Sequence, residues 1–136
     1  MKERTLAAVI DNIPEVTAFI EEQLEALDCP MKAQLQIDVA VDELFTNIAH
    51  YAYPDKTGNA TVQFDYDEGA HTVSITFIDS GIPFDPLKKA DPDVTLSAEE
   101  REVGGLGISM VKKSMDNVTY RFENGHNILT IQKRIG

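Results

Sequence analysis

The sequence predicts an α+β fold, a two-layer sandwich in which helices cover one face of a mixed or mostly antiparallel sheet. Two observations lead to this prediction. The spacing of apolar residues gives the order strand, helix, helix, strand, strand, loop, helix, strand, strand. Tight turns join the late strands, which makes those neighbours antiparallel. The 136 residues, 43% of them hydrophobic, suffice for one domain spanning 1–136 with a single core.

The first half of the chain is expected to form one strand and two helices. An apolar run over residues 6–10 indicates the strand. Asn12 then has the position of an N-cap, and Glu15 would complete a capping box. This first helix ends before Pro30. The second helix runs over about residues 31–53, with apolar residues at helical spacing along one side.

The second half alternates apolar and polar residues and predicts two strand pairs separated by a loop and a helix. Asn124–Gly125 is its strongest hairpin signal. Residues 80–104 lack sustained periodicity, and a loop of this length in a small domain is usually a functional lid or a mobile segment. The expected elements are strands over 62–66 and 73–77, a helix from the glycines at 104–107 to Met115, and strands over 118–122 and 128–133.

The charge balance restricts the kinds of partner. Lys and Arg number 12 and Asp and Glu number 23, a formal net charge of −11. This argues against nucleic acid and an anionic membrane surface, and favours a basic protein surface. Cys29 is the only cysteine, so an internal disulfide is excluded and a reducing, cytoplasmic setting is expected. The chain starts without a signal-peptide pattern and contains no run long enough to span a bilayer.

A first candidate site is on the second helix. Glu43 and Asn47 are four residues apart, so they lie on one face, beside the apolar stripe. An asparagine next to a buried stripe is unfavourable without a partner, and its neutral oxygen suits Mg²⁺. Glu43 could then orient or deprotonate an attacking hydroxyl or water. The alternative is that both residues form the solvated edge of an amphipathic helix.

Two further patches complete a possible nucleotide site. Asp79 ends an apolar strand and precedes Ser80-Gly81, where a carboxylate could accept a hydrogen bond from an exocyclic amine and a glycine lets a flat ring approach. The alternative is an ordinary Asp-Ser-Gly turn. Gly104, Gly105 and Gly107 open a helix whose bare N–H groups could bind phosphates, or they form a flexible hinge. Their spacing fits neither a P-loop nor a dinucleotide fingerprint.

These motifs together resemble those of the GHKL (Bergerat-fold) ATPases, which have the histidine-kinase-like ATPase fold. The resemblance is closest to the stand-alone anti-sigma factor serine/threonine kinases of bacteria, and it covers almost the whole chain. The first motif is Glu43-Leu44-Phe45-Thr46-Asn47, and the second runs from Asp79 to Pro86. The third is the glycine cluster followed by a helix and Met115-Asp116.

The resemblance implies roles for these positions. Glu43 matches the catalytic base and Asn47 the magnesium ligand. Asp79, with Gly81 beside it, matches the carboxylate that reads adenine. Gly105 and Gly107 match the phosphate-loop glycines, and residues 85–104 match the lid over ATP. The family uses ATP and Mg²⁺, phosphorylates a serine on a STAS-domain antagonist, alternately sequesters a sigma factor, and commonly forms homodimers.

The chain also departs from the family pattern. Tyr51 stands where many members have a histidine, and Val103 stands where many have an arginine before the glycines. Members can place a threonine from the last strands near adenine, and here Asn127 and Thr130 both remain candidates. The competing functions are therefore a non-catalytic ATP-binding module that regulates a basic partner, and a detached histidine-kinase catalytic domain.

Overall fold

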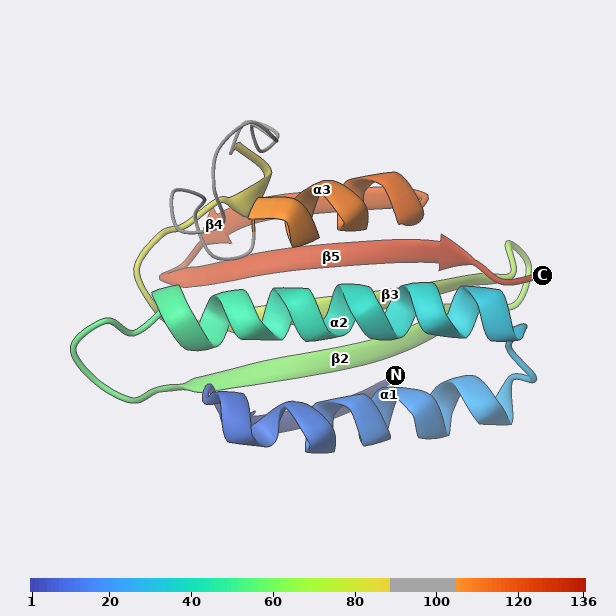
Figure 1. Ribbon diagram of the computed structural model, residues 1–136, viewed down its shortest axis with the longest axis horizontal. Helices are drawn as coiled ribbons and strands as arrows, with labels where there is room; N and C mark the ends of the chain where they lie inside the picture. Colours follow the sequence, from blue (N-terminus) through green and yellow to red (C-terminus); the bar gives the residue numbers. More distant parts are fainter. Residues whose placement is uncertain (89–104) are drawn as a thin grey trace.

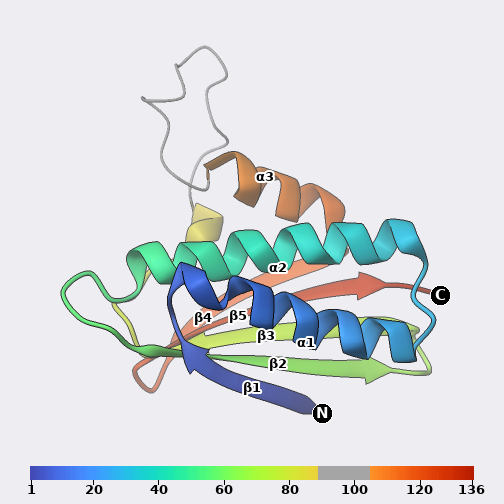
Figure 2. The same ribbon diagram turned by 60° about the horizontal axis from the view of Figure 1, so that its bottom comes forward.

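A five-stranded antiparallel sheet forms one layer of the molecule, and helices on one of its faces form the other (Figures 1 and 2). The computed structural model describes residues 1–88 and 105–136. The strand order is β1-β2-β3-β5-β4. In chain order the elements are β1 (Lys2–Ala7), η1 (Ile10–Asn12), α1 (Ile13–Ala26), α2 (Met31–Tyr51), β2 (Asn59–Asp67), β3 (Thr72–Asp79), η2 (Pro86–Lys88), α3 (Gly105–Ser114), β4 (Asn117–Glu123) and β5 (His126–Arg134).

The core lies between the sheet and the helices. Alternate residues of β2, β3 and β5 are buried, as expected for strands with one face turned toward the helices. The helices contribute apolar stripes from α1, α2 and α3. The largest fully buried side chains include Phe45 of α2, Phe77 and Ile75 of β3, and Ile131 of β5. The predicted α+β sandwich is therefore confirmed, and every strand pairing is antiparallel rather than mixed.

The turns explain why the hairpins close where the sequence predicts. Asn124 and Gly125 have φ angles of 53° and 80°, the left-handed conformations that a two-residue hairpin turn requires. Asp67 organises the β2–β3 turn, because its Oδ1 accepts hydrogen bonds from the backbone N–H groups of Gly69 and Ala70 at 3.0 and 3.2 Å. Both turns use side chains or conformations that few other residues supply.

The start of the chain differs from the expectation in two respects. The first strand begins and ends earlier than predicted, at Lys2 and Ala7. The predicted capping box is wrong, since the Asn12 side chain makes no cap hydrogen bond to α1. Its Nδ2 instead donates to the carbonyl of Ala7 at 2.8 Å, because a short 3₁₀ turn separates the strand from the helix. The side chain therefore fixes that turn rather than the helix end.

Segments from both halves of the chain meet at one end of the sandwich. The C-terminal half of α2, the end of β3, η2 and the first turn of α3 lie together on the left of Figure 1. The start of β5 is there too, because Asp79 pairs with Asn127 in the β3–β5 register. No helix in the described ranges has the length and apolar content needed to cross a membrane. The shared end of the sandwich is where the candidate site lies.

Candidate functional site

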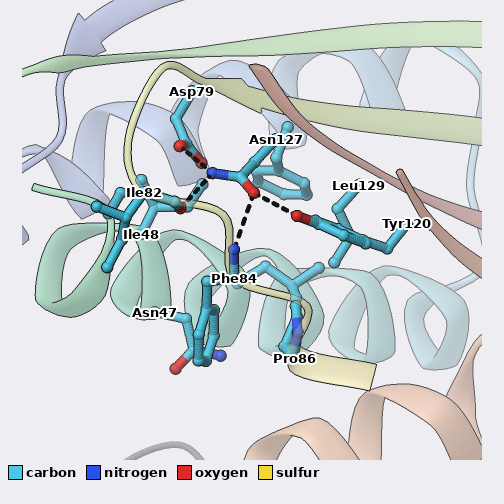
Figure 3. Close-up of a pocket in the computed structure, with 12 residues that line it drawn as sticks. Asn47, Ile48, Asp79, Ile82, Phe84, Pro86, Tyr120, Asn127 and Leu129 are labelled. Carbon is cyan, nitrogen blue, oxygen red and sulfur yellow. Dashed lines mark hydrogen bonds between the residues drawn. The ribbon is translucent and has the colours of Figure 1, made fainter. Parts of the chain in front are cut away.

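A pocket lies between α2 and the end of the sheet (Figure 3). Figure 3 shows Asp79 and Asn127 at one end of it and Asn47 at the other. Two of the predicted site residues therefore line one cavity although they are 32 positions apart in the sequence. The lining residues are Leu44, Asn47, Ile48, Ala52, Phe77, Asp79, Ile82, Phe84, Pro86, Tyr120, Asn127 and Leu129.

Asn47 is buried, with 5% of its surface exposed. Its Oδ1 makes no hydrogen bond within the described part of the chain. A buried amide oxygen without a hydrogen-bond partner destabilises the folded state by about 1–3 kcal/mol. The requirements of folding alone therefore do not explain an asparagine at this position. This excludes the solvated helix edge as an explanation for Asn47, and it identifies an oxygen ready to accept a ligand.

Glu43 lies one helical turn before Asn47 and faces the start of α3. A Cβ atom placed on Gly107 would lie 2.0 Å from Cδ of Glu43 and 2.2 Å from its Oε2. Such distances are impossible for real atoms, so a side chain at position 107 would displace the carboxyl of Glu43, which packs against the α3 backbone. The first and third motifs are therefore in contact. Gly105 is the first residue of α3, whereas Gly104 lies outside the described residues.

Asp79 is also buried, with 6% of its surface exposed. Burial raises the pKa of its carboxyl above the ordinary value, while hydrogen bonds from Asn127 and Gly81 and the charge of His126 lower it in part. Oδ1 accepts both hydrogen bonds, each at 2.9 Å. A buried carboxylate held at a strand end can accept a hydrogen bond from a ligand amine with its second oxygen.

Gly81 is needed for a different reason from the one the sequence suggested. A Cβ atom at Gly81 would lie 2.2 Å from the carbonyl oxygen of Ala52, so the missing side chain faces the end of α2 rather than a ligand ring. The next residue, Ile82, donates its N–H to the same carbonyl at 2.9 Å. The glycine therefore lets the chain after β3 turn tightly against α2, which positions Asp79 and the segment that follows.

Asn127, rather than Thr130, belongs to the pocket. Asn127 hydrogen-bonds Asp79, whereas the hydroxyl of Thr130 contacts that of Thr76 at 2.9 Å on the other face of the sheet. The sequence carried a signal for this, because Asn127 has the same parity along the strand as the buried Leu129 and Ile131. The contribution of Tyr120 was not anticipated, since nothing local distinguishes it from the other alternating residues of β4.

Phe84 lines the pocket and stacks on an aromatic residue of α2. The rings of Tyr51 and Phe84 stack with centroids 5.2 Å apart and an interplanar angle of 24°. Tyr51 is the residue that replaces the family's histidine, so here the position packs against the chain that follows the second motif. That chain reaches η2, and the rest of the predicted lid at 85–104 lies outside the described residues.

The donor set fits a magnesium nucleotide better than a protein-only metal centre. Within the described ranges no three His, Cys, Asp or Glu side chains are grouped so as to hold a metal ion. Mg²⁺ in nucleotide enzymes is held mainly by phosphate oxygens and water, with only one or two protein oxygens. The unpartnered Oδ1 of Asn47 is such an oxygen, so the residues present fit the ion.

Comparison with known proteins shows which family this chain belongs to. Residues 6–133 match the family described as the histidine kinase-like ATPase domain. This match spans nearly the whole chain, and the chain therefore belongs to that family. The order of the three motifs predicted this assignment from the sequence.

The chain is also similar in sequence to several curated proteins. The chain is 26% identical over 119 residues to the anti-sigma F factor of Clostridium acetobutylicum, covering 88% of this chain and 79% of that protein. It is 23% identical over 100 residues to the serine/threonine-protein kinase BtrW of Bordetella bronchiseptica, covering 74% and 70%. It is 30% identical over 95 residues to the serine-protein kinase RsbW of Bacillus cereus strain B4264, covering 67% of this chain but 58% of that kinase.

Solved structures share the fold. The RsbU and RsbW domains of Rv1364c from Mycobacterium tuberculosis match with a TM-score of 0.64 at 16% identity, over 99% of this chain and 33% of that one. The histidine kinase domain of a blue-light activated kinase from Erythrobacter litoralis matches with a TM-score of 0.57 at 18% identity, over 78% and 46%. At these identities the likeness establishes the fold alone.

Proposed function

We propose that this chain is an ATP-dependent protein serine kinase that acts as an anti-sigma factor in a partner switch. The observation that carries the proposal is the buried, unpartnered Oδ1 of Asn47 in a pocket that also contains the carboxylate of Asp79. An apolar pocket with a few convergent polar groups and a perturbed carboxyl is the usual form of a ligand site. The family match supports a purine nucleotide as that ligand.

In this proposal the two ends of the pocket hold different parts of ATP. Asp79 accepts a hydrogen bond from the exocyclic amine of adenine, and the apolar walls formed by Leu44, Phe77 and Leu129 contact the ring. The phosphates extend toward α3, where Gly105 and Gly107 offer backbone N–H groups and the positive end of the helix dipole. Asn47 holds Mg²⁺, which when bound neutralises phosphate charge.

Glu43 is the proposed catalytic base. It lies on the same face of α2 as Asn47 and contacts the first turn of α3 at Gly107, so it is close to where the phosphates are proposed to lie. A serine hydroxyl of the substrate would give its proton to Glu43 as the oxygen attacks the terminal phosphorus of ATP, and ADP would leave. Most of the rate enhancement would come from positioning and charge stabilisation rather than from covalent chemistry.

The proposed partners are a STAS-domain antagonist, which would receive the phosphoryl group, and a sigma factor, which would be sequestered. The names of the relatives, an anti-sigma F factor and serine-protein kinases, support this pair. The net charge of −11 favours basic protein surfaces and argues against direct contact with nucleic acid or an anionic membrane. We propose a cytoplasmic homodimer that follows the family pattern.

The test combines nucleotide binding with phosphoryl transfer. The chain is titrated with ATP in the presence and absence of Mg²⁺, and then incubated with labelled ATP and a STAS-domain protein from the same organism. Glu43→Ala is expected to abolish transfer while ATP affinity stays within about threefold of wild type. Asn47→Ala is expected to weaken Mg²⁺-ATP binding by at least about tenfold.

Each outcome separates the proposed kinase from its competitors. Transfer at the normal rate by Glu43→Ala would show that Glu43 is not the base. ATP binding without any transfer would favour a regulatory module that uses ATP only as a switching ligand. A phosphoprotein that acid rapidly hydrolyses would favour a detached histidine-kinase domain, because phosphoserine survives acid and phosphohistidine does not.

A further inference from the structure

Asn127 is the most highly connected polar side chain in the pocket. Its Nδ2 donates to Oδ1 of Asp79 at 2.9 Å and to the carbonyl of Ile82 at 2.8 Å. Its Oδ1 accepts from the N–H of Phe84 at 3.1 Å and from the hydroxyl of Tyr120. An asparagine amide has two N–H donors and an oxygen with two lone pairs, so all four hydrogen-bonding positions are used. Figure 3 shows these four interactions around Asn127.

This saturation gives Asn127 a role opposite to that of Asn47. Both amides are buried in the same pocket, with 6% and 5% of their surfaces exposed. Asn47 has an unused oxygen, whereas Asn127 can bond a ligand only by breaking a bond it already makes. The amide of Asn127 also has one allowed orientation, because a flip would set its oxygen against the carboxylate of Asp79 and the carbonyl of Ile82. Asn127 therefore acts on a ligand through other residues.

The residue through which it acts most directly is Asp79. Oδ1 of that carboxylate is occupied by Nδ2 of Asn127 and by the N–H of Gly81. None of the hydrogen bonds among the described residues goes to Oδ2. The two bonds hold the carboxylate plane and leave one oxygen available to a ligand donor. A carboxylate fixed in this way discriminates between a ring that presents an amine and a ring that presents a carbonyl.

Asn127 also connects the pocket to the chain that leads toward η2. It contacts Ile82 and Phe84 on both sides of Pro83, and so it fixes that segment to the start of β5. The ring of Phe84 in turn stacks on Tyr51 of α2. The hydroxyl of Tyr120 reaches the same amide oxygen from β4. One side chain thus fixes the base-reading carboxylate and an aromatic wall of the pocket relative to each other.

We infer that Asn127 is a positioning residue for nucleotide selectivity, which presents one oxygen of Asp79 to the exocyclic amine of a 6-aminopurine. The inference rests on the proposed function, since it assumes that the pocket receives ATP. It goes beyond that function because it assigns the selectivity for the base to a saturated amide that does not touch the nucleotide. The hydroxyl of Tyr120 supports Asn127 in this role.

The test compares ATP with inosine triphosphate, in which a carbonyl replaces the amine at the same ring position. Calorimetry with Mg²⁺ gives the affinity for each nucleotide and hence their ratio. Wild type is expected to prefer ATP. Asn127→Leu keeps the approximate shape but removes every hydrogen bond, and the preference for ATP is expected to fall roughly tenfold. The matched control is Thr130→Val, an equally small change on the outer face of the same strand, which is expected to leave the ratio unchanged.

The outcomes are distinguishable. If Asn127→Leu lowers the affinity for both nucleotides equally, the residue only supports the pocket structurally and the inference is overturned. If that variant does not fold, as judged by circular dichroism, Tyr120→Phe decides, because it removes one hydroxyl from the network. It is expected to reduce the preference for ATP about threefold, and an unchanged ratio in a folded Tyr120→Phe protein overturns the inference. A wild-type chain that binds neither nucleotide would instead overturn the proposed function.

Discussion

At the scale of single residues, Asp79 combines a structural penalty with its proposed role in binding. Burial raises the pKa of its carboxyl, and the hydrogen bonds from Asn127 and Gly81 offset only part of that shift. When the pKa of a carboxyl is higher in the folded state than in the unfolded state, the protein becomes less stable as the pH rises and the carboxyl ionises. At neutral pH the ionised carboxylate therefore lowers the free energy of unfolding, so Asp79 does not serve the stability of the fold.

Asp79→Asn is expected to separate these two effects. The amide oxygen can still accept from Asn127 and Gly81, while the buried charge is gone, so the free energy of unfolding at neutral pH should rise. The amide nitrogen would meet the purine amine donor to donor, and ATP affinity should fall at least about tenfold. Urea unfolding and calorimetry on the same preparation measure both quantities. A more stable variant with unchanged ATP affinity would remove Asp79 from the binding site.

Gly107 allows a second prediction at this scale. An alanine there would place Cβ 2.0 Å from Cδ of Glu43, so the carboxyl must move. A displacement of about 1 Å at a catalytic group can lower a rate about 100-fold, and Gly107→Ala is expected to do so for phosphoryl transfer. Gly69→Ala is the matched control, because its Cβ would lie 3.4 Å from Asp67 in a surface turn. If both variants transfer phosphate at the wild-type rate, Glu43 does not act from this position.

At the scale of the elements, the sequence predicted what depends on local patterns. Alternation in β2 and β3, helical spacing in α2 and the Asn124–Gly125 turn each specify their own structure, and their positions agree with the expectation. The first helix does begin directly after Asn12, as predicted. Only the predicted capping hydrogen bond was wrong, because the same side chain can cap a helix or fix a turn, and here it bonds the carbonyl of Ala7. Local patterns are therefore sufficient for elements but not for the use of a polar side chain.

In the candidate site, too, local patterns predicted some features and long-range packing determined others. The motif order predicted that Asn47, Asp79 and Gly107 lie at one end of the sandwich, since each is near the end of an element that the topology brings there. The network around Asn127 was not predictable in the same way. It depends on the register between β4 and β5, in which Tyr120 lies opposite Leu129, two residue pairs from the Phe122–Asn127 pair. Register is fixed by long-range packing as well as by the turn.

The packing of α1 against α2 makes stability depend on pH. Burial is the main reason that the pKa of Asp38 on α2 is raised to about 6. A hydrogen bond with Glu21 on α1 and the negative charge of Glu21 also contribute to this shift. Its folded pKa exceeds the unfolded value, so the protonated carboxyl stabilises the helix pair and this contribution is lost as the pH rises through about 6. Burial, and after it the charge of Asp38, also raises the pKa of the thiol of Cys29, which lies between α1 and α2.

Asp38→Asn is expected to flatten this dependence. The amide can remain hydrogen-bonded to Glu21 without a proton being taken up, so the variant should gain stability over wild type near pH 7.5 and lose most of that advantage near pH 4, close to the ordinary carboxyl pKa of 3.8. Urea unfolding at the two pH values measures the difference. Glu22→Gln on the exposed side of α1 is the charge-matched control, because it changes net charge equally without altering the pair. An equal pH response in Asp38→Asn and Glu22→Gln would show that net charge alone explains the effect.

At the scale of the whole molecule, the charge of the chain makes magnesium central to nucleotide binding. A protein with a net charge of −11 repels a free nucleotide triphosphate, and the described part of the pocket contains no Lys or Arg. Backbone N–H groups at α3 and the oxygen of Asn47 are neutral, so they do not compensate the phosphate charge. A divalent ion bound with the nucleotide reduces that charge and uses the oxygen that folding leaves without a hydrogen bond.

Asn47→Leu therefore tests whether nucleotide binding depends on a magnesium ion held by Asn47. Replacing the amide by an apolar group of similar shape removes a buried oxygen without a partner, so the melting temperature without ligand should rise. A ligand present at about 100 times its Kd raises the free energy of unfolding by about 2.7 kcal/mol, which wild type should show with Mg²⁺ and ATP but not after the metal is removed by EDTA. Asn47→Leu should lose most of the difference between these two conditions. A variant that retains the full Mg²⁺-dependent stabilisation would show that another group holds the ion, and one that melts lower than wild type without ligand would show that Asn47 has a structural partner.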